Sequence, residues 1–361
     1  MSRHTVDDLQ AIADAIVAMA EPGEQIEANV ARSRETDIRV YNGELEHFVS
    51  AQSQGISVRV IKDGRTGSSH AGTLDEAAWR EVLAEARENA TLGGVDEWAG
   101  LAEPDGVAIV EQELWDDTLD AFDTAKKIEI AKELERAAVG ADPRVRIDDS
   151  NYSDGATEEA FATTMGIRSS GRSNSCYASV SVMADDSGET QTGWAYALGK
   201  NPAEFDLAKA GVEAANKATG LLGAVKPPSK RTTVVLDPMV TAQFLGIIGS
   251  TLNGESVVKG RSLFANRLGE AVASPLITLV DDPTDSRAYT ASEIDSEGLA
   301  ARRNVLIKDG VLQMFVHSSY SARRAGTKST GNAVGGGVGC LSLQLTPGTK
   351  TQGELIADIE E

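Results

Sequence analysis

Apolar residues near the N-terminus recur at the spacing of an amphipathic helix. Thr5 and Asp8 stand in the spacing of a capping box, so the first helix is predicted to begin at Thr5. A second capping-box pattern joins Thr73 to Glu76, and Trp79 follows it on the predicted inner face. The pattern therefore predicts one helix that begins at Thr5 and a second that begins at Thr73.

Between these helices the hydrophobic pattern changes to alternation, which is typical of half-buried strands. Residues 27–36 and 37–40 are predicted to form a pair of strands, followed by a turn at Asn42-Gly43. Strands are then expected at residues 44–50 and 55–61. Asn-Gly between alternating runs is a strong hairpin signal, so the pairing should be antiparallel.

The same order of elements returns further along the chain. A helix is predicted from about Asp123 to Val139, strands from Val145 to about Leu198, and a helix starting at Asn201-Pro202. Gly55-Ile56 in the first set has its counterpart in Gly166-Ile167 in the second. Tight turns between strands and segregated helices indicate the α+β class. We therefore expect an α+β fold with a structural duplication.

Two prolines flanked by lysines, in residues 226–230, mark the clearest domain boundary. The predicted division is an N-terminal α+β subdomain at residues 1–105, a central α+β subdomain at 106–225, and a β-rich C-terminal domain at 229–361. The acidic helical segment at Thr351–Glu361 places negative charge at the unfavourable end of a helix dipole. From this we expect the last domain to be incomplete through C-terminal truncation.

Inside the C-terminal domain three local signals stand out. Residues 232–236 are predicted to form a short strand, and Asp237-Pro238 to start a helix. Residues 305–312 are predicted to form a hairpin with Asp309-Gly310 as its turn. The domain should therefore combine short strands with at least one apolar helix.

Composition narrows the classes of partner and compartment. The chain carries 55 acidic and 34 basic residues, a formal charge of −21, which argues against binding nucleic acid or anionic membranes. Its start lacks the basic and apolar regions of a signal peptide. No apolar run approaches the ~18 residues that span a bilayer. Cys176 and Cys340 are the only cysteines, so a disulfide framework is not expected. We therefore expect a cytoplasmic location.

Several ordered motifs share a resemblance that extends across most of the chain. They are Tyr41–Glu44, Gly55–Ile61, Asn253–Gly269, Ser274–Asp282, Asp295–Gly298, Val305–Leu312 and Ser319–Gly326. Together they resemble the TldD/PmbA metallopeptidase family. The resemblance implies an activity on unfolded or leader-type peptides within an assembly of homologous subunits.

In the catalytic branch of that family, a His-Glu-x-x-x-His motif holds Zn²⁺ just before the Ser256–Gly260 stretch. The corresponding positions here are Leu245, Gly246 and Ser250, which offer no good zinc ligand. The resemblance therefore implies a TldE/PmbA-type, non-catalytic subunit without a cofactor of its own. Zinc is expected in a TldD-like partner, with which the chain would form a heterodimer, or else it would form a homodimer.

Two other functions stay open. One is a hydrolase in its own right, with ligands that the motif does not reveal. The older family name of gyrase modulator would instead imply a regulatory binding protein. The resemblance to a peptidase partner explains the substituted motif best, and a zinc and peptidase assay separates the three.

Few other residues offer chemistry. The histidines are His4, His47, His70 and His317, and none has a second ligand at metal-binding spacing. Asp295, Glu297 and His317 are candidates to line a cleft, and a turn is the alternative for the two acidic residues. Other features are interpreted as structural: the two cysteines as core thiols, residues 335–339 as a glycine-rich loop, and the pairs Asp148-Asp149, Asp185-Asp186 and Asp281-Asp282 as turn residues.

Overall fold

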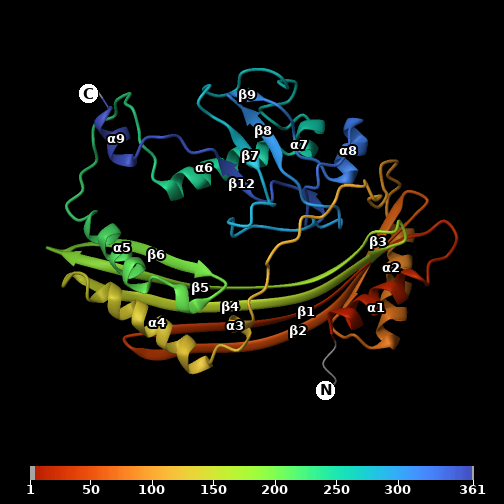
Figure 1. The fold of residues 1–361 in the computed structure, drawn as a ribbon, viewed down its shortest axis with the longest axis horizontal. Coiled ribbons are helices and arrows are strands. Elements are labelled where there is room, and N and C mark those ends of the chain that lie inside the picture. The colour runs from red at the N-terminus through yellow and green to blue at the C-terminus, as the bar shows by residue number, and fades with distance from the viewer. Residues whose placement is uncertain (1–4, 360–361) are drawn as a thin grey trace.

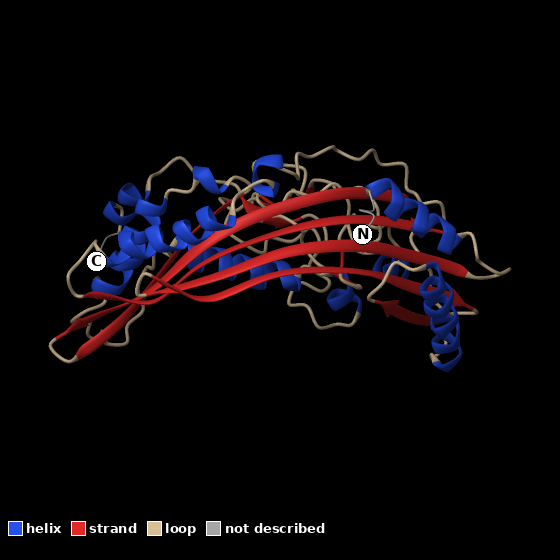
Figure 2. Cartoon of the chain, turned by 90° about the horizontal axis from the view of Figure 1, so that it is seen from below, coloured by secondary structure: helices blue, strands red, loops and turns tan. Residues whose placement is uncertain are grey.

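A long, curved, six-stranded antiparallel sheet forms the base of the molecule in the computed structural model, which describes residues 5–359 (Figures 1 and 2). The strand order is β3-β2-β1-β4-β5-β6. The bounds are β1 Gln25–Tyr41, β2 Glu44–Lys62, β3 Arg65–Ala71, β4 Val145–Thr163, β5 Arg168–Asp186 and β6 Glu189–Gly199. The sheet and its helices confirm the α+β class.

The predicted duplication is confirmed by the symmetry of this sheet. One half runs α1 (Val6–Val17), β1, β2, β3 and α2 (Glu76–Leu92). The other runs α4 (Thr124–Val139), β4, β5, β6 and, after the short 3-10 helix η1 (Pro202–Glu204), α5 (Leu207–Thr219). The two halves join through the antiparallel pair β1–β4, so both contribute to a single continuous sheet.

All four long helices of these halves cover one face of the sheet, which we call the helical face. Alternate residues of β1, such as Ile26 and Val30, pack under α1 and α2, whereas Ile38 and Val40 pack under α4 and α5. In β4 the neighbours Ala160 and Ala162 also face helices. Phe161 between them therefore points to the opposite face, which we call the domain face because the C-terminal domain lies over part of it (Figure 1).

Two short strands carry glycines on which a helix rests directly. A Cβ added to Gly67 in β3 would overlap backbone atoms of Ala86 and Ala90 in α2. A Cβ added to Gly193 in β6 would overlap the backbone of Ala214 in α5 in the same way. Each half of the duplication thus uses a glycine to bring its last helix close to its last strand.

Local turn and cap signals were good predictors in the first half. Thr5 and Asp8 form the predicted capping box, and Asn42-Gly43 forms the predicted turn with φ values of 52° and 76°. The predicted strand pair at 27–40 is wrong, because these residues belong to the single 17-residue strand β1. No turn residue interrupts them, and pairing with both β2 and β4 keeps the segment extended.

Two helix starts also differ from the prediction. Thr73 does not cap α2, whose N-cap is Asp75; the Thr73 hydroxyl instead donates to the Asp75 carboxylate over 2.8 Å. Asn201-Pro202 starts only the 3-10 turn, and Asp206 caps α5 through a hydrogen bond from the Lys209 N–H. The prediction that a helix begins at Asp123 is confirmed, since Asp123 caps α4.

The C-terminal domain consists of short strands, helices and long loops. A four-stranded sheet has the order β12-β7-β8-β9, and β10 and β11 form a separate hairpin. The strands are β7 Leu279–Asp281, β8 Asn304–Lys308, β9 Val311–Leu312, β10 Ala333–Val334, β11 Gly337–Val338 and β12 Leu343–Leu345. The helices are α6 Pro238–Thr251, α7 Gly254–Val258, α8 Ser319–Ala325 and α9 Gln352–Ala357.

Predictions for this domain had mixed outcomes. The hairpin at Asp309-Gly310 and the helix start at Asp237 are confirmed. The strand at 232–236 is wrong: the segment has no regular secondary structure, joins no sheet among residues 5–359 and is largely exposed. Apolar β-forming residues alone do not make a strand when no other strand pairs with them. Gly335 and Gly336 form the turn between β10 and β11.

Several contacts join the C-terminal domain to the sheet and to the segments beside it. Residues 106–116 pass from the C-terminal domain to the helical face, where α3 (Asp117–Asp120) begins (Figure 1). A Cβ at Gly298 would lie 2.6 Å from Ile167 and 2.9 Å from Phe161, so the Asp295–Gly298 turn rests directly on the sheet. The division into residues 1–105, 106–225 and 229–361 stays a prediction. Within the described residues, no helix is long and apolar enough to cross a membrane.

Candidate functional site

The helix α6 carries the three positions that the sequence aligns with a zinc motif. Leu245 packs partly against the core of the C-terminal domain, and Gly246 is exposed with open space around it. Ser250 is exposed, and its hydroxyl donates to the Ile247 carbonyl over 2.7 Å. Residues 238–251 include no His, Cys, Asp or Glu. The side chains of α6 therefore do not fit a zinc ion.

Beyond α6, the side chains that could bind a metal are scattered over the described residues. No group of three or more His, Cys, Asp and Glu side chains in residues 5–359 is arranged to hold a metal ion. His47 lies on β2 and His70 on β3, and His4 lies outside the described residues.

Asp295 is buried in a turn that organises the C-terminal domain. Its Oδ1 accepts hydrogen bonds from the N–H groups of Glu297 and Leu299 at 2.9 and 3.0 Å, and its Oδ2 accepts one from Ala333 at 3.0 Å. Burial raises the pKa of this carboxyl to about 6, although the three N–H donors act in the opposite direction. Asp295 therefore holds the turn that touches the sheet, and it also borders a cavity.

Glu297 and His317 lie near the start of α8. The Glu297 carboxylate accepts hydrogen bonds from the Ser319 N–H at 2.8 Å and the Ser319 hydroxyl at 2.6 Å. His317 is buried with Nδ1 3.1 Å from the Ser321 hydroxyl, and burial lowers its pKa. Both side chains thus position the first turn of α8. The cleft-lining role of the three residues stays a prediction.

The acidic pairs and cysteines are mostly structural. Asp282 takes part in a turn with Thr284, but the turn assignment of Asp281 is wrong. Asp281 is fully buried in β7 and accepts hydrogen bonds of 2.6 Å from the Asn332 amide and the Ser342 N–H. Both thiols, Cys176 and Cys340, have pKa values raised to about 12 by burial, so they stay protonated and unreactive.

A cavity of about 420 Å³ lies between the sheet and the C-terminal domain. Its floor includes Glu159 and Phe161 of β4 and residues 168–173 of β5. The turn that contains Asp295 forms one wall, and Leu114 of the linker another. The lining combines the carboxylates of Glu159, Glu293 and Asp295 with serine hydroxyls and apolar side chains.

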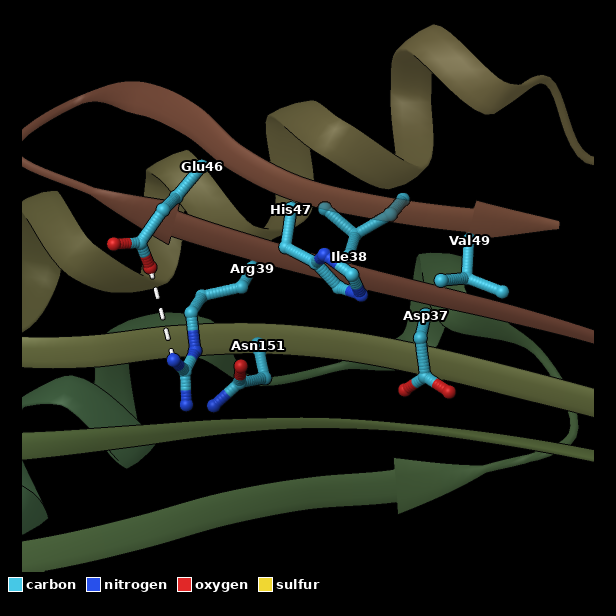
Figure 3. A pocket seen from close by; sticks show the side chains of 7 residues that line it. All are labelled: Asp37, Ile38, Arg39, Glu46, His47, Val49 and Asn151. Atoms are coloured by element: carbon cyan, nitrogen blue, oxygen red, sulfur yellow. Dashed lines mark ion pairs between the residues drawn. The ribbon is translucent and has the colours of Figure 1, made fainter.

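Beyond the C-terminal domain the domain face of the sheet is open, and it contains a hollow of about 550 Å³ (Figure 3). Asp37, Arg39, His47 and Asn151 project into it from β1, β2 and β4. The Arg39 guanidinium lies 3.7 Å from the carboxylates of both Glu46 and Asp149. Sequence reasoning missed this surface, although polar residues alternating with Ile38 and Val40 were its available signal.

Three family models match successive parts of the chain. Residues 26–90 match domain 1, residues 117–222 the central domain and residues 229–361 the C-terminal domain of the PmbA/TldA metallopeptidases. Together these ranges span most of the sequence and follow the order of the fold.

Relatives and solved structures agree with these matches. A metalloprotease of Methanocaldococcus jannaschii is 24% identical over 96% of this chain and 78% of its own length. The metalloprotease PmbA of Escherichia coli O157:H7 is 26% identical over 85% of this chain and 69% of its own.

The fold is similar to that of TldE from Thermococcus kodakarensis, with a TM-score of 0.84, 22% identity, and coverage of 98% of this chain and 80% of that one. A Bacteroides thetaiotaomicron protein described as a putative modulator of DNA gyrase gives 0.89 at 24% identity, covering 99% of this chain and 81% of that one. The ordered motifs, the three family matches and the shared fold lead to one conclusion: this chain belongs to the PmbA/TldD metallopeptidase family.

Proposed function

We propose that this chain is a non-catalytic subunit of a peptidase assembly, paired with a zinc-bearing homologue of the TldD type. The observation that carries the proposal is α6. In a family of metallopeptidases, this helix offers Leu245, Gly246 and Ser250 at the positions aligned with the zinc motif. None of these side chains supplies the imidazole or carboxylate that zinc coordination and water activation require.

The proposed role of the chain is to hold and present peptide. The cavity beside Asp295 and the open sheet face beyond it are lined by polar and aromatic side chains, which suit an extended polypeptide. Unfolded or leader-type peptides are the proposed substrates of the assembly. The strongly acidic composition disfavours nucleic acid as a partner. Free thiols at Cys176 and Cys340 are compatible with the proposed cytoplasmic location.

The test is to purify the chain alone, a His-Glu-x-x-x-His homologue alone, and the two after co-expression. Zinc content, peptide hydrolysis and molar mass are measured for each. We expect a stable complex in which zinc and hydrolysis depend on the homologue. Zinc and hydrolysis in the lone chain would identify it as a peptidase itself. Absence of any complex, together with no hydrolysis, would favour a regulatory binding protein.

A further inference from the structure

The open part of the domain face has a defined arrangement of side chains. Strand register places Asp37 opposite Ser153, which is opposite Tyr177, which is opposite Leu198. Directly opposed residues of a sheet present their side chains on the same face. This first row therefore crosses the sheet from a carboxylate on β1 to apolar side chains on β5 and β6.

Two further rows repeat this layout. Arg39 is opposite Asn151, and the same row continues through Ser179 to Tyr196. The next row places Asp149 opposite Ser181, which is opposite Trp194. The rows thus divide the surface into a charged half on β1, β2 and β4 and an aromatic half on β5 and β6. We call this surface the platform.

The aromatic half carries several large apolar side chains that lie side by side and are exposed to solvent. Its large side chains are exposed by 41 to 44%, and they are Tyr177, Trp194, Tyr196 and Leu198. The rings of Trp194 and Tyr196 lie 5.1 Å apart between centroids. Contiguous exposed apolar side chains rimmed by polar ones mark interaction sites. Aromatic faces also attract cations, which gives this half a preference among ligands.

The charged half shares that preference. Asp37 and Glu46 lie near the Arg39 guanidinium (Figure 3), and Asp149 adds a third carboxylate beside it. Arg146 in the next row is already paired with Asp185 at 2.6 Å. Asp37 and Glu46 are exposed, so their charge is available to a ligand. The chain as a whole carries −21 charges, which disfavours an anionic ligand or a second copy on this surface. Charge complementarity therefore favours a cationic occupant.

We propose that the platform binds extended polypeptide segments whose side chains are basic over one half of the segment and apolar over the other. Five strands at about 4.8 Å spacing give a width of about 20 Å, the length of about six extended residues. A segment that crosses the strands would place lysine or arginine near Asp37 and Asp149, and apolar side chains on Tyr196 and Trp194. This inference rests on the proposed peptide-handling function and specifies which peptides the chain would hold.

The test uses the chain alone and a fluorescein-labelled octapeptide of four lysines followed by four leucines, with fluorescence anisotropy at low salt as the readout. An octapeptide of four glutamates followed by four leucines is the matched probe. We expect the lysine peptide to bind at least tenfold more tightly, and its affinity to fall as salt rises. Equal binding of the two peptides, or no binding of the lysine peptide, would overturn the proposal.

Variants locate the binding. The double variant D37N/D149N should weaken binding of the lysine peptide about three- to tenfold, because exposed ion pairs contribute up to about fivefold each. Y196S should weaken it by a similar factor. R39Q should strengthen it about two- to fivefold, because it removes the competing cation. An R39Q variant with unchanged or weaker binding would contradict the charge argument.

Controls separate the platform from general effects. E81Q on α2 and Y289S in the C-terminal domain alter exposed side chains of the same types elsewhere and should leave binding unchanged. Peptide binding should also quench tryptophan emission in the wild type and not in W194F. Effects of E81Q or Y289S equal to those of the platform variants would reject the site. Neither zinc nor a homologue is present in this binding experiment. A negative result therefore does not contradict the proposed assembly, and a negative result in the assembly test does not contradict peptide binding by the platform.

Discussion

The Tyr320 hydroxyl donates a hydrogen bond of 2.7 Å to the Asp96 carboxylate and so joins α8 of the C-terminal domain to the segment that follows α2. The same carboxylate accepts the Trp98 N–H at 2.9 Å. These donors, the Trp98 N–H first and Tyr320 second, hold the pKa of Asp96 below its usual value. Nearby, the Arg323 guanidinium donates to the carbonyls of Trp98 and Gly100. The first helix after His317 thus fastens the domain to the sheet.

Replacing Tyr320 by phenylalanine should weaken this attachment. A hydrogen bond to a charged acceptor contributes about 1.5 to 3 kcal/mol, and this partly exposed one should be at the low end, so we expect a loss of about 1 to 1.5 kcal/mol in the free energy of unfolding. A carboxyl group whose pKa is lower in the folded protein than in the unfolded chain stabilises the fold at pH values above the unfolded pKa. This stabilisation is lost as the pH falls through the folded pKa. The loss should therefore shrink below about pH 4.

Urea unfolding of wild type and Y320F at pH 7 and pH 3.5 measures both values. Y289F removes an exposed hydroxyl elsewhere and is the control. A Y320F defect that is as large at pH 3.5 as at pH 7 would show that the charge on Asp96 is not involved.

Gly67 and Gly193 should be the least substitutable glycines of the two halves. An added methyl group would overlap backbone atoms of α2 or α5, which cannot move aside as a side chain would. We expect G67A and G193A each to cost about 3 kcal/mol, at the upper end for overpacking. G246A is the matched control, since its Cβ meets nothing within 4 Å and alanine favours a helix. Thermal unfolding should show two destabilised variants and one that is unchanged or more stable.

Local chemistry explains which parts of the fold were predictable. Turns at Asn42-Gly43 and Asp309-Gly310 follow from the positive φ values that Asn, Asp and Gly tolerate. The helix start at Asp123 needs only a side chain that accepts a hydrogen bond from the backbone N–H two residues on, that of Ala125. The strand predicted at 232–236 failed because strand formation depends on a pairing partner that lies outside the segment. Residues 27–40 were split for the opposite reason, since partners on both sides keep β1 continuous.

The candidate site was less predictable, because it depends on register. Asp37 and Tyr177 belong to different halves of the chain, and only the pairing of β1, β4 and β5 brings them into one row. A shift of one residue would move every side chain of a strand to the other face. Asp295 stood out in sequence through its motif, but its three N–H partners include Ala333 from the distant strand β10. Motifs identified the residues, and topology decided what they do.

Asp295 should make stability depend on pH in a direction opposite to that of Asp96. Burial raises its pKa to about 6 in the folded state, from a usual value of 3.8. A raised folded pKa contributes stability that is complete below the unfolded value and is lost as pH rises through about 6. The melting temperature of the wild type relative to D295N should therefore be highest near pH 4 and decline towards pH 7.

Thermal unfolding of both proteins at intervals of half a pH unit from pH 4 to pH 7 gives this difference curve. D281N is an informative comparison, because burial also raises the pKa of Asp281 and the same direction is expected. E81Q, an exposed change on α2, should give a flat curve. A curve for D295N that is flat or rises towards pH 7 would contradict the assigned environment of Asp295.

Limited proteolysis should cut first in the segment between α5 and α6. Residues 224–234 are exposed and belong to no helix or strand, and such segments are preferred sites of cleavage. Trypsin should cleave after Lys230 and Arg231, and not after Lys226, because Pro227 follows it. The two fragments should stay together on gel filtration, since Arg323 and Tyr320 still hold the C-terminal domain to the residues around Asp96.

K230Q/R231Q should slow the first cut, and Y320F should speed separation of the fragments. Early cleavage within α2 or β5 instead would show that this segment is protected in solution.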